Sequence, residues 1–199
     1  MNGNDLFQLL RQVGALKDGH FLLSSGRHGD QYIEKFDLLR QPRQTEAVCR
    51  GFVERFANAG VDIVAGPTTG GIILAYEVGR QLGVAAAYAE RMSDGSPGRE
   101  FRRGTTFATG QRVLVVDDIL TTGGSVRDTL TALRNLPVEI VAVAVLVDRS
   151  GGKVNFGDVP LSALSTADVA SWDPDNCPQC RDGVPLVKPG TSTPLGMPS

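Results

Sequence analysis

The chain has 199 residues, a length that suits a single domain able to bury most of its apolar surface. Hydrophobic residues make up 41% of the sequence and charged residues 21%, and the formal net charge of −2 argues against a nucleic-acid or anionic-membrane partner. No apolar run is long enough to cross a bilayer, and the polar, acidic start is unlike a signal peptide. Three cysteines are an odd number and form no disulfide framework, so we expect the protein to be located in the reducing cytoplasm.

The N-terminal segment predicts a helix followed by a β-hairpin. Apolar residues recur with helical spacing over residues 5–13, and Gly14 provides a stop for this helix. Two short β-like runs within residues 19–35 flank a turn at residues 25–27, which predicts the hairpin.

The next segment alternates predicted helices and strands. Apolar spacing predicts a helix over 41–59, and short β-favouring runs predict strands over 61–65 and 84–89. Between these two strands lies a turn of small residues, 66–71, which leads into a predicted helix over 72–82.

The most informative stretch is 113–125. Four β-favouring apolar residues run into Asp117 and Asp118, and a turn rich in threonine, glycine and serine leads to a helical pattern near Val126. This order predicts a buried strand, a loop at its carboxyl end that contains both aspartates, and a helix directly behind the loop. A nearly continuous apolar run over 139–147 predicts a strand buried on both faces. Strands alternating with helices predict an α/β fold with an open, mostly parallel twisted sheet and helices on both faces.

Two segments interrupt this pattern. Residues 90–103 are polar, contain glycine and proline, and show no periodicity, so we expect a mobile loop or a hairpin. From Trp172 the composition shifts, and six of the eleven prolines lie between Pro174 and Pro198. We expect this tail to be extended and its very end to be disordered.

The tail also carries a C-x2-C pair, Cys177 and Cys180, which could be half of a zinc site. No second cysteine or histidine pair follows it, and two ligands do not hold a structural zinc, so we expect no metal–thiolate site.

The sequence shows neither a repeat nor a second domain. We therefore expect one domain over 1–199, with an N-terminal segment (1–40), an α/β core (41–172) and a Pro-rich tail (173–199).

The residue types in 117–125 indicate a ribose 5-phosphate ligand. The amino terminus of a helix has unsatisfied N–H groups and a positive dipole, so a loop of threonine, glycine and serine suits a phosphate there. The two carboxylates can accept hydrogen bonds from sugar hydroxyls or lie beside a hydrated divalent cation. A purely structural interpretation is also open, because aspartate, threonine and glycine commonly cap helices and form turns.

The whole string 113–125 resembles the phosphoribosyl-diphosphate (PRPP) loop of the type I phosphoribosyltransferases. The resemblance implies that family's α/β fold, with Asp117 and Asp118 holding the ribose hydroxyls and residues 121–125 holding the 5-phosphate. The PRPP-binding residues that it implies are Asp117, Asp118, Ile119, Leu120, Thr121, Thr122, Gly123, Gly124 and Ser125.

The turn at 66–71 would by itself indicate only a packed strand–helix junction. Beside a PRPP-like loop it resembles the diphosphate loop of the same family, in which backbone N–H groups contact the leaving diphosphate. The residues implied are Thr68, Thr69, Gly70 and Gly71. Their small side chains leave room for a close approach of the backbone.

The hairpin around Ser25-Gly26-Arg27 is similar to the F-x-L-x-S-G segment of the orotate phosphoribosyltransferases, which covers the base. The resemblance implies that Ser25, Gly26 and Arg27 contact orotate together with Thr121 and Arg149. Arg149 follows the apolar strand 139–147 and can bind a planar carboxylate in bidentate fashion, although an exposed surface arginine is the common alternative. The hairpin could also be a simple sheet edge. The tail over 176–190 resembles the carboxyl end of one bacterial group of these enzymes.

One segment departs from this resemblance. Many orotate phosphoribosyltransferases carry an R-K-x-x-K-x-H-G loop that closes over the diphosphate, whereas this sequence has no lysine or histidine between Phe36 and Gly152. A cation of the flexible loop must therefore be an arginine, which stays protonated and is a poor proton donor. The candidates are Arg91 first, and then Arg99, Arg102 and Arg103.

The resemblance implies transfer of the phosphoribosyl group from PRPP to orotate in pyrimidine biosynthesis. It also implies Mg²⁺ bound mostly through substrate and water, with no dedicated protein site and possible contact near Asp117 and Asp118. A homodimer is expected, with the 90–103 loop reaching the partner's site. Two alternatives stay open: a phosphoribosyltransferase acting on a purine, and a PRPP-sensing regulator that has lost catalysis.

Overall fold

A computed structural model describes residues 3–23, 25–167 and 170–189. The chain divides into two units, which are described separately. Within the described ranges, the first unit comprises residues 3–6 and 39–167, and the second comprises the remainder. Helix α1 (Gly3–Gln12) begins in the first unit and ends in the second. It confirms the predicted N-terminal helix, and Gly14 stops it in a left-handed conformation with φ of 72°.

A six-stranded sheet forms the centre of the first unit, in the order β5-β4-β3-β6-β7-β8. Every neighbouring pair is parallel except β4 and β5. The predicted open, mostly parallel sheet is therefore confirmed. Its strands are β3 (Ile63–Pro67), β4 (Ala85–Arg91), β5 (Arg99–Phe101), β6 (Arg112–Leu120), β7 (Glu139–Asp148) and β8 (Leu161–Thr166).

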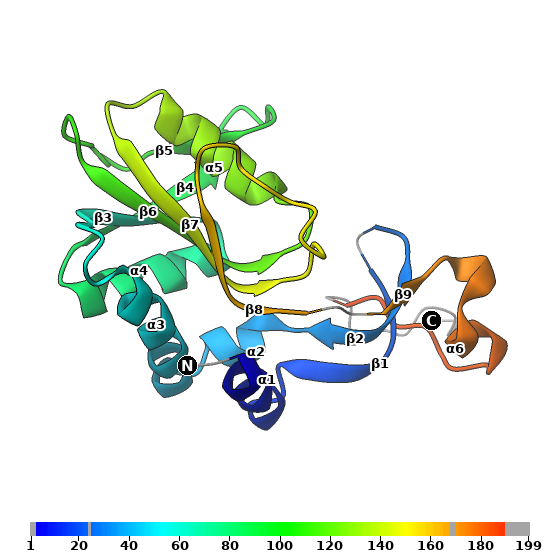
Figure 1. Cartoon of the computed structure of the whole chain (residues 1–199). Helices are drawn as coiled ribbons and strands as arrows, with labels where there is room; N and C mark the ends of the chain where they lie inside the picture. The colour runs from blue at the N-terminus through cyan, green and yellow to red at the C-terminus, as the bar shows by residue number, and fades with distance from the viewer. Residues whose placement is uncertain (1–2, 24, 168–169, 190–199) are drawn as a thin grey trace. The chain divides into compact units, whose positions relative to one another are not determined.

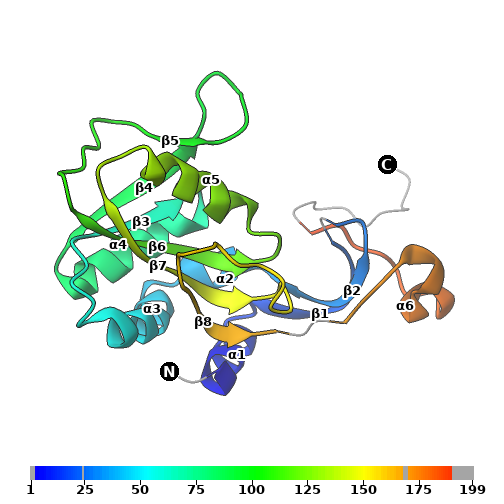
Figure 2. The same cartoon turned by 45° about the horizontal axis from the view of Figure 1, so that its top comes forward.

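Helices cover both faces of this sheet, as predicted. The helices are α3 (Pro42–Phe56), α4 (Gly70–Leu82) and α5 (Gly124–Arg134). Figures 1 and 2 show α5 on one face and α3 with α4 on the other. Val126, Leu130 and Leu133 of α5 are almost fully buried against valines of β6 and β7. No helix in the described ranges is long and apolar enough to cross a membrane.

The order of the strands reverses direction between β3 and β6. From β3 the chain passes through α4 to β4 on one side, and from β6 it passes through α5 to β7 on the other. At such a switch point two loops diverge at the carboxyl edge of the sheet, and ligands bind in the crevice between them. The fold therefore places residues 67–70 and 120–124 at the position where a site is expected.

The central strand is longer than predicted. β6 continues through Asp117 and Asp118 to Leu120, because Asp117, Ile119 and Leu120 remain paired with β7. The expectation that both aspartates lie in the loop is therefore wrong: the loop begins at Thr121. The side chain of Leu120 belongs to the core and is 2% exposed.

The two edge strands of the sheet, β5 and β8, were less well predicted from the sequence than the central strands. Residues 90–103 contain a hairpin, since β5 pairs with β4 through Arg91 and Arg99, so the hairpin alternative is the one observed. Strand β8 was not predicted. It has six residues at the edge of the sheet and is only partly buried, so its sequence carries little apolar signal.

The second unit contains a three-stranded antiparallel sheet in the order β1-β2-β9. β1 (Leu16–Leu22) and β2 (His28–Ile33) form the predicted hairpin, and β9 (Ser171–Trp172) pairs with β2. Helix α2 (Lys35–Leu39), which was not predicted, follows the hairpin. The tail is not simply extended, because it forms a 3-10 turn η1 (Pro174–Asn176) and the short helix α6 (Pro178–Arg181). The expected disorder concerns residues 190–199, which lie outside the described residues.

The buried centre of β6 gives a test of this core. Replacing Leu114, which is 0% exposed, by alanine leaves a cavity and is expected to lower the free energy of unfolding by about 2–5 kcal/mol. The control Thr131→Ala, at an exposed position of α5, is expected to change it by less than about 0.5 kcal/mol. Urea unfolding followed by circular dichroism measures both. Equal effects of the two variants would contradict the assignment of β6 to the core.

Candidate active site

The loop between β6 and α5 presents a helix amino terminus to the crevice. Gly123 occupies the N-cap of α5 with φ of 78°, and a Cβ at this position would lie 2.9 Å from Val154 Cγ1, so only glycine fits. No side chain caps the helix, which leaves the N–H groups of its first turn available to an anion. The loop encloses a small hollow of about 70 Å³, lined by Asp117 and residues 119–126.

The two aspartates are anchored by the backbone of β6. Asp117 and Asp118 are 9% and 3% exposed. The amide of Asp118 donates to Asp117 Oδ1 at 2.9 Å, and the amide of Ile119 donates to Asp118 Oδ1 at 2.7 Å. Because they are successive strand residues, their side chains point to opposite faces of the sheet. One carboxylate thus faces the α5 side of the crevice and the other faces the α4 side.

The loop between β3 and α4 presents the second helix amino terminus. Its Thr68–Thr69 peptide bond is cis, and the N-cap Thr69 makes no side-chain capping bond. A Cβ on Gly70 would lie 2.0 Å from Asp118 Oδ2, so glycine is required for this carboxylate to lie at the start of α4. The predicted diphosphate loop and the predicted PRPP loop are therefore in direct contact through Gly70 and Asp118.

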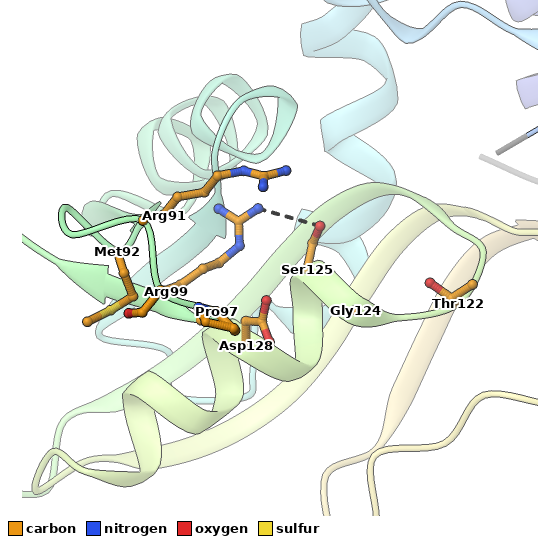
Figure 3. Close-up of a pocket in the computed structure, with 11 residues that line it drawn as sticks. Arg91, Met92, Pro97, Arg99, Thr122, Gly124, Ser125 and Asp128 are labelled. Atoms are coloured by element: carbon orange, nitrogen blue, oxygen red, sulfur yellow. Dashed lines mark hydrogen bonds between the residues drawn. The ribbon is translucent and has the colours of Figure 1, made fainter.

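Arg99 joins the same two loops from strand β5. Its Nη1 donates to Thr68 Oγ1 at 2.8 Å and to Ala89 O at 2.9 Å, and its Nη2 donates to Thr68 O at 3.2 Å. Nη2 also donates to Ser125 Oγ at 3.5 Å (Figure 3). The residue is 9% exposed. Burial lowers the pKa of the Arg99 guanidinium and the charge of Asp117 opposes this shift, but an arginine remains charged at neutral pH.

A cavity of about 630 Å³ lies between the β4–β5 turn and the start of α5. Figure 3 shows the Arg91 and Arg99 side chains beside Ser125 in this cavity. Among the described residues of the 90–103 segment, Arg91 is the one arginine whose side chain makes no hydrogen bond or ion pair, and it is exposed. Arg102 and Arg103 instead pair with Glu90, and the hydrogen bond from Arg103 in particular holds the pKa of that carboxyl below its usual range.

The residues predicted to contact the base are placed in both units. In the first unit, Arg149 directly follows β7, is half-buried, and donates its amide to Leu120 O at 2.8 Å, while Thr121 is exposed at the start of its loop. In the second unit, Ser25 and Gly26 lie in the hairpin turn. Arg27 donates through Nη1 to Asp173 at 2.6 Å and through Nη2 to Ser171 O at 2.6 Å. Their contact with orotate stays a prediction.

Some lining residues were missed from the sequence. Asp128 lies one helical turn after Ser125 on α5, so its i+3 spacing from the loop was the available signal. The turn residues that line the cavity lie in a segment without periodicity, where no such signal exists. They are Met92, Gly95, Ser96, Pro97 and Gly98.

One premise of the expectation for the tail cysteines fails, namely that no second ligand pair is available. Cys177 and Cys180 do have a second ligand pair, because His20 and His28 of the hairpin lie beside them. No such pair follows the cysteines in the sequence, but the fold brings one from residues that precede them by about 150 positions.

Comparison with known proteins agrees with this geometry. A family model for the phosphoribosyl transferase domain matches residues 37–175. The orotate phosphoribosyltransferase of Desulforamulus reducens is 43% identical over 191 residues, covering 96% of this chain and 98% of that protein. The enzyme of the same name from Caldicellulosiruptor saccharolyticus is 44% identical with the same coverage. The crystal structure of orotate phosphoribosyltransferase from Aeropyrum pernix superposes with a TM-score of 0.71 at 29% identity, covering 81% of this chain and 93% of that one.

The doubly wound sheet, its two adjoining loops at helix starts and the family match place the chain in a known class: it belongs to the phosphoribosyltransferase family. Within that family it groups with the orotate phosphoribosyltransferases, which it matches over nearly the full length of both chains. The resemblance of residues 113–125 to a phosphoribosyltransferase loop is thereby confirmed at the level of the family.

The contacts of Arg99 give a stability test of the junction between the loops. Arg99→Met removes its four hydrogen bonds, including both bonds to Thr68, so we expect a loss of about 2–4 kcal/mol in unfolding free energy. Arg103→Met is the matched control, because its side chain is 68% exposed and should matter much less. Urea unfolding of both variants distinguishes them, and a control as damaging as Arg99→Met would contradict the bridging role.

Proposed function

We propose that the chain transfers the ribose 5-phosphate group of PRPP to N1 of orotate, giving orotidine 5′-monophosphate and diphosphate. The observation that carries this proposal is that two helices without a side-chain cap, α4 at Gly70 and α5 after Gly123, begin directly behind the neighbouring strands β3 and β6. One start suits the 5-phosphate and the other suits the diphosphate, and the aspartates of β6 lie between them.

The proposed catalysis rests on positioning and on charge. Displacement at the anomeric carbon passes through an oxocarbenium-like state, so no nucleophilic side chain is needed. Holding the ribose between two anion sites restricts its motion relative to the base. The negative charge that develops on the leaving diphosphate lies near the cavity that Arg91 and Arg99 line.

We further propose Mg²⁺ as the metal of the reaction, held mainly by substrate and water beside Asp117 and Asp118. The donor set fits this ion, because carboxylate oxygens at the end of β6 are the hard ligands that Mg²⁺ prefers. When bound, the ion would neutralise part of the charge of the diphosphate. The protein's own contribution is to fix both carboxylates through the amides of residues 118 and 119.

Orotate is proposed as the acceptor base because the matched relatives are named orotate phosphoribosyltransferases. Orotate carries a carboxylate, and the half-buried Arg149 at the carboxyl end of β7 offers a guanidinium that can bind one in bidentate fashion. We also propose a homodimer in which the 90–103 loop reaches the partner's site. Sedimentation showing only a 21.1 kDa species at assay concentration would contradict the dimer.

The first measurement is diphosphate release from PRPP, with Mg²⁺, in the presence of orotate, hypoxanthine, xanthine or uracil. We expect release with orotate alone, and loss of release when a chelator replaces Mg²⁺. Release with a purine would assign the chain to the purine alternative. Tight binding of PRPP without turnover of any base would support the regulator instead.

Arg91 is expected to be the loop cation that stabilises the leaving diphosphate. Its side chain lines the cavity and, among the described residues, has no hydrogen bond or ion pair, whereas Arg99 bonds both loops. Arg91→Ala should lower kcat by about 100-fold or more, and Arg91→Lys should retain part of the rate because the charge is kept. Arg103→Ala is the comparison, because Arg103 is paired with Glu90. A larger loss in kcat for Arg103→Ala than for Arg91→Ala would move the role to Arg103.

A further inference from the structure

Four side chains of the second unit converge on one point outside the loops described above. They are His20 on β1, His28 on β2, Cys177 directly before α6, and Cys180 within α6. Their potential ligand atoms all lie within 4.8 Å of one another. The sequence contains two histidines and three cysteines in total, so this cluster gathers both histidines and all but one of the cysteines.

The distances within the cluster are those of a tetrahedral metal site. Zinc bonds of about 2.3 Å to sulfur and about 2.0 Å to nitrogen place sulfur and nitrogen ligands about 3.6 Å apart. Cys177 Sγ lies 3.4 Å from His20 Nε2, and Cys180 Sγ lies 3.7 Å from the same atom and 3.2 Å from His28 Nδ1. The two ring nitrogens are 3.0 Å apart, against about 3.3 Å for two nitrogen ligands of zinc.

The protonation of His20 is fixed by its outer neighbour. His20 Nδ1 lies 2.7 Å from Val184 O, and a carbonyl can only accept, so Nδ1 carries the proton. In the neutral ring Nε2 is then an unprotonated acceptor that faces the two thiols. Ligating histidines in metal sites commonly donate their other nitrogen to a carbonyl in this way.

The backbone already holds the two ligand pairs together. The amide of Val187 donates to His20 O at 2.8 Å, and the amide of Leu22 donates to Val187 O at 2.9 Å, so the tail runs alongside β1. His20, His28 and Cys177 are at most 5% exposed, whereas Cys180 is exposed. Three of the four residues are thus buried, and the exposed Cys180 offers the approach from solvent.

A cluster without metal is the competing interpretation. His28 Nδ1 could donate to His20 Nε2, and the thiols could make weak hydrogen bonds or form a disulfide. A hydrogen-bonded cluster accounts for the short distance between the nitrogens. It gives no reason for a C-x2-C pair to face two histidines, a combination typical of structural zinc sites.

We propose that His20, His28, Cys177 and Cys180 hold one zinc ion in a structural Cys2His2 centre. Four protein ligands leave no open position for substrate, so the ion ties the tail segment 170–189 to the β1–β2 hairpin rather than taking part in catalysis. The proposal does not rest on the function proposed above, because none of the four residues belongs to the loops of the first unit.

The direct test is the metal content of the full chain, purified reduced and without a polyhistidine tag. Elemental mass spectrometry should find about one zinc ion per chain in the wild type. The control Cys49→Ala, which removes the buried thiol of α3 outside the cluster, should contain the same amount. Cys177→Ser and Cys180→Ser should each lose most of the zinc. Wild-type protein that neither contains zinc nor takes it up after reduction would overturn the proposal, as would Cys180→Ser with an unchanged zinc content.

Cobalt substitution keeps the test independent of how well the variants fold. Wild-type protein treated with a chelator and reloaded with Co²⁺ should show the intense visible bands of tetrahedral cobalt and a thiolate-to-metal charge-transfer band, and added zinc should abolish both. A weak octahedral spectrum without charge transfer would overturn the proposal.

Thiol reactivity gives a third readout. Burial raises the pKa of the Cys49 thiol to about 12, so this thiol should stay unmodified by iodoacetamide in the native protein. Cys177 and Cys180 should be protected while zinc is present and alkylated once it is removed. Equal alkylation with and without zinc, or a Cys177–Cys180 disulfide in protein purified under reducing conditions, would overturn the proposal.

Discussion

The parallel pairing of β3 with β6 is the constraint on which the first unit depends. These two strands hydrogen-bond side by side through residues 63–65 and 113–115, and the chain leaves them toward opposite faces of the sheet. Their helices therefore begin next to each other, and two sets of unsatisfied amides face the same crevice. The close approach of Asp118 to Gly70 is a consequence of this pairing, and it also places Thr68 and Ser125 near enough for Arg99 of the β4–β5 hairpin to reach both.

Much of the α/β core could be predicted from the sequence because its signals are local. The helix at 70–82 and the strand at 139–148 follow from apolar spacing alone, since each buries a continuous face or run. The end of β6 could not be predicted, because charged residues normally terminate a strand and here β7 continues to pair with them. The edge strands β5 and β8 are short and only partly buried, so they leave weak patterns.

The candidate site likewise has parts that could be predicted from the sequence and parts that could not. The two loops were predictable as motifs, because glycine and threonine before a helix have a physical meaning wherever they occur. The bridging role of Arg99 was not predictable, since it depends on a hairpin that brings residue 99 back beside residue 68. Convergence of His20 with Cys180 joins residues 160 positions apart, and no local pattern encodes such a contact.

The location of Arg99 on an edge strand has a consequence for how the crevice forms. β5 has three residues and pairs with β4 alone within the described sheet, so it is among the elements least protected against local opening. Any local opening of this hairpin would remove the same guanidinium from Thr68 and from Ser125, and so from both loops together. The arrangement of the two loops thus depends on one side chain that a short edge hairpin carries.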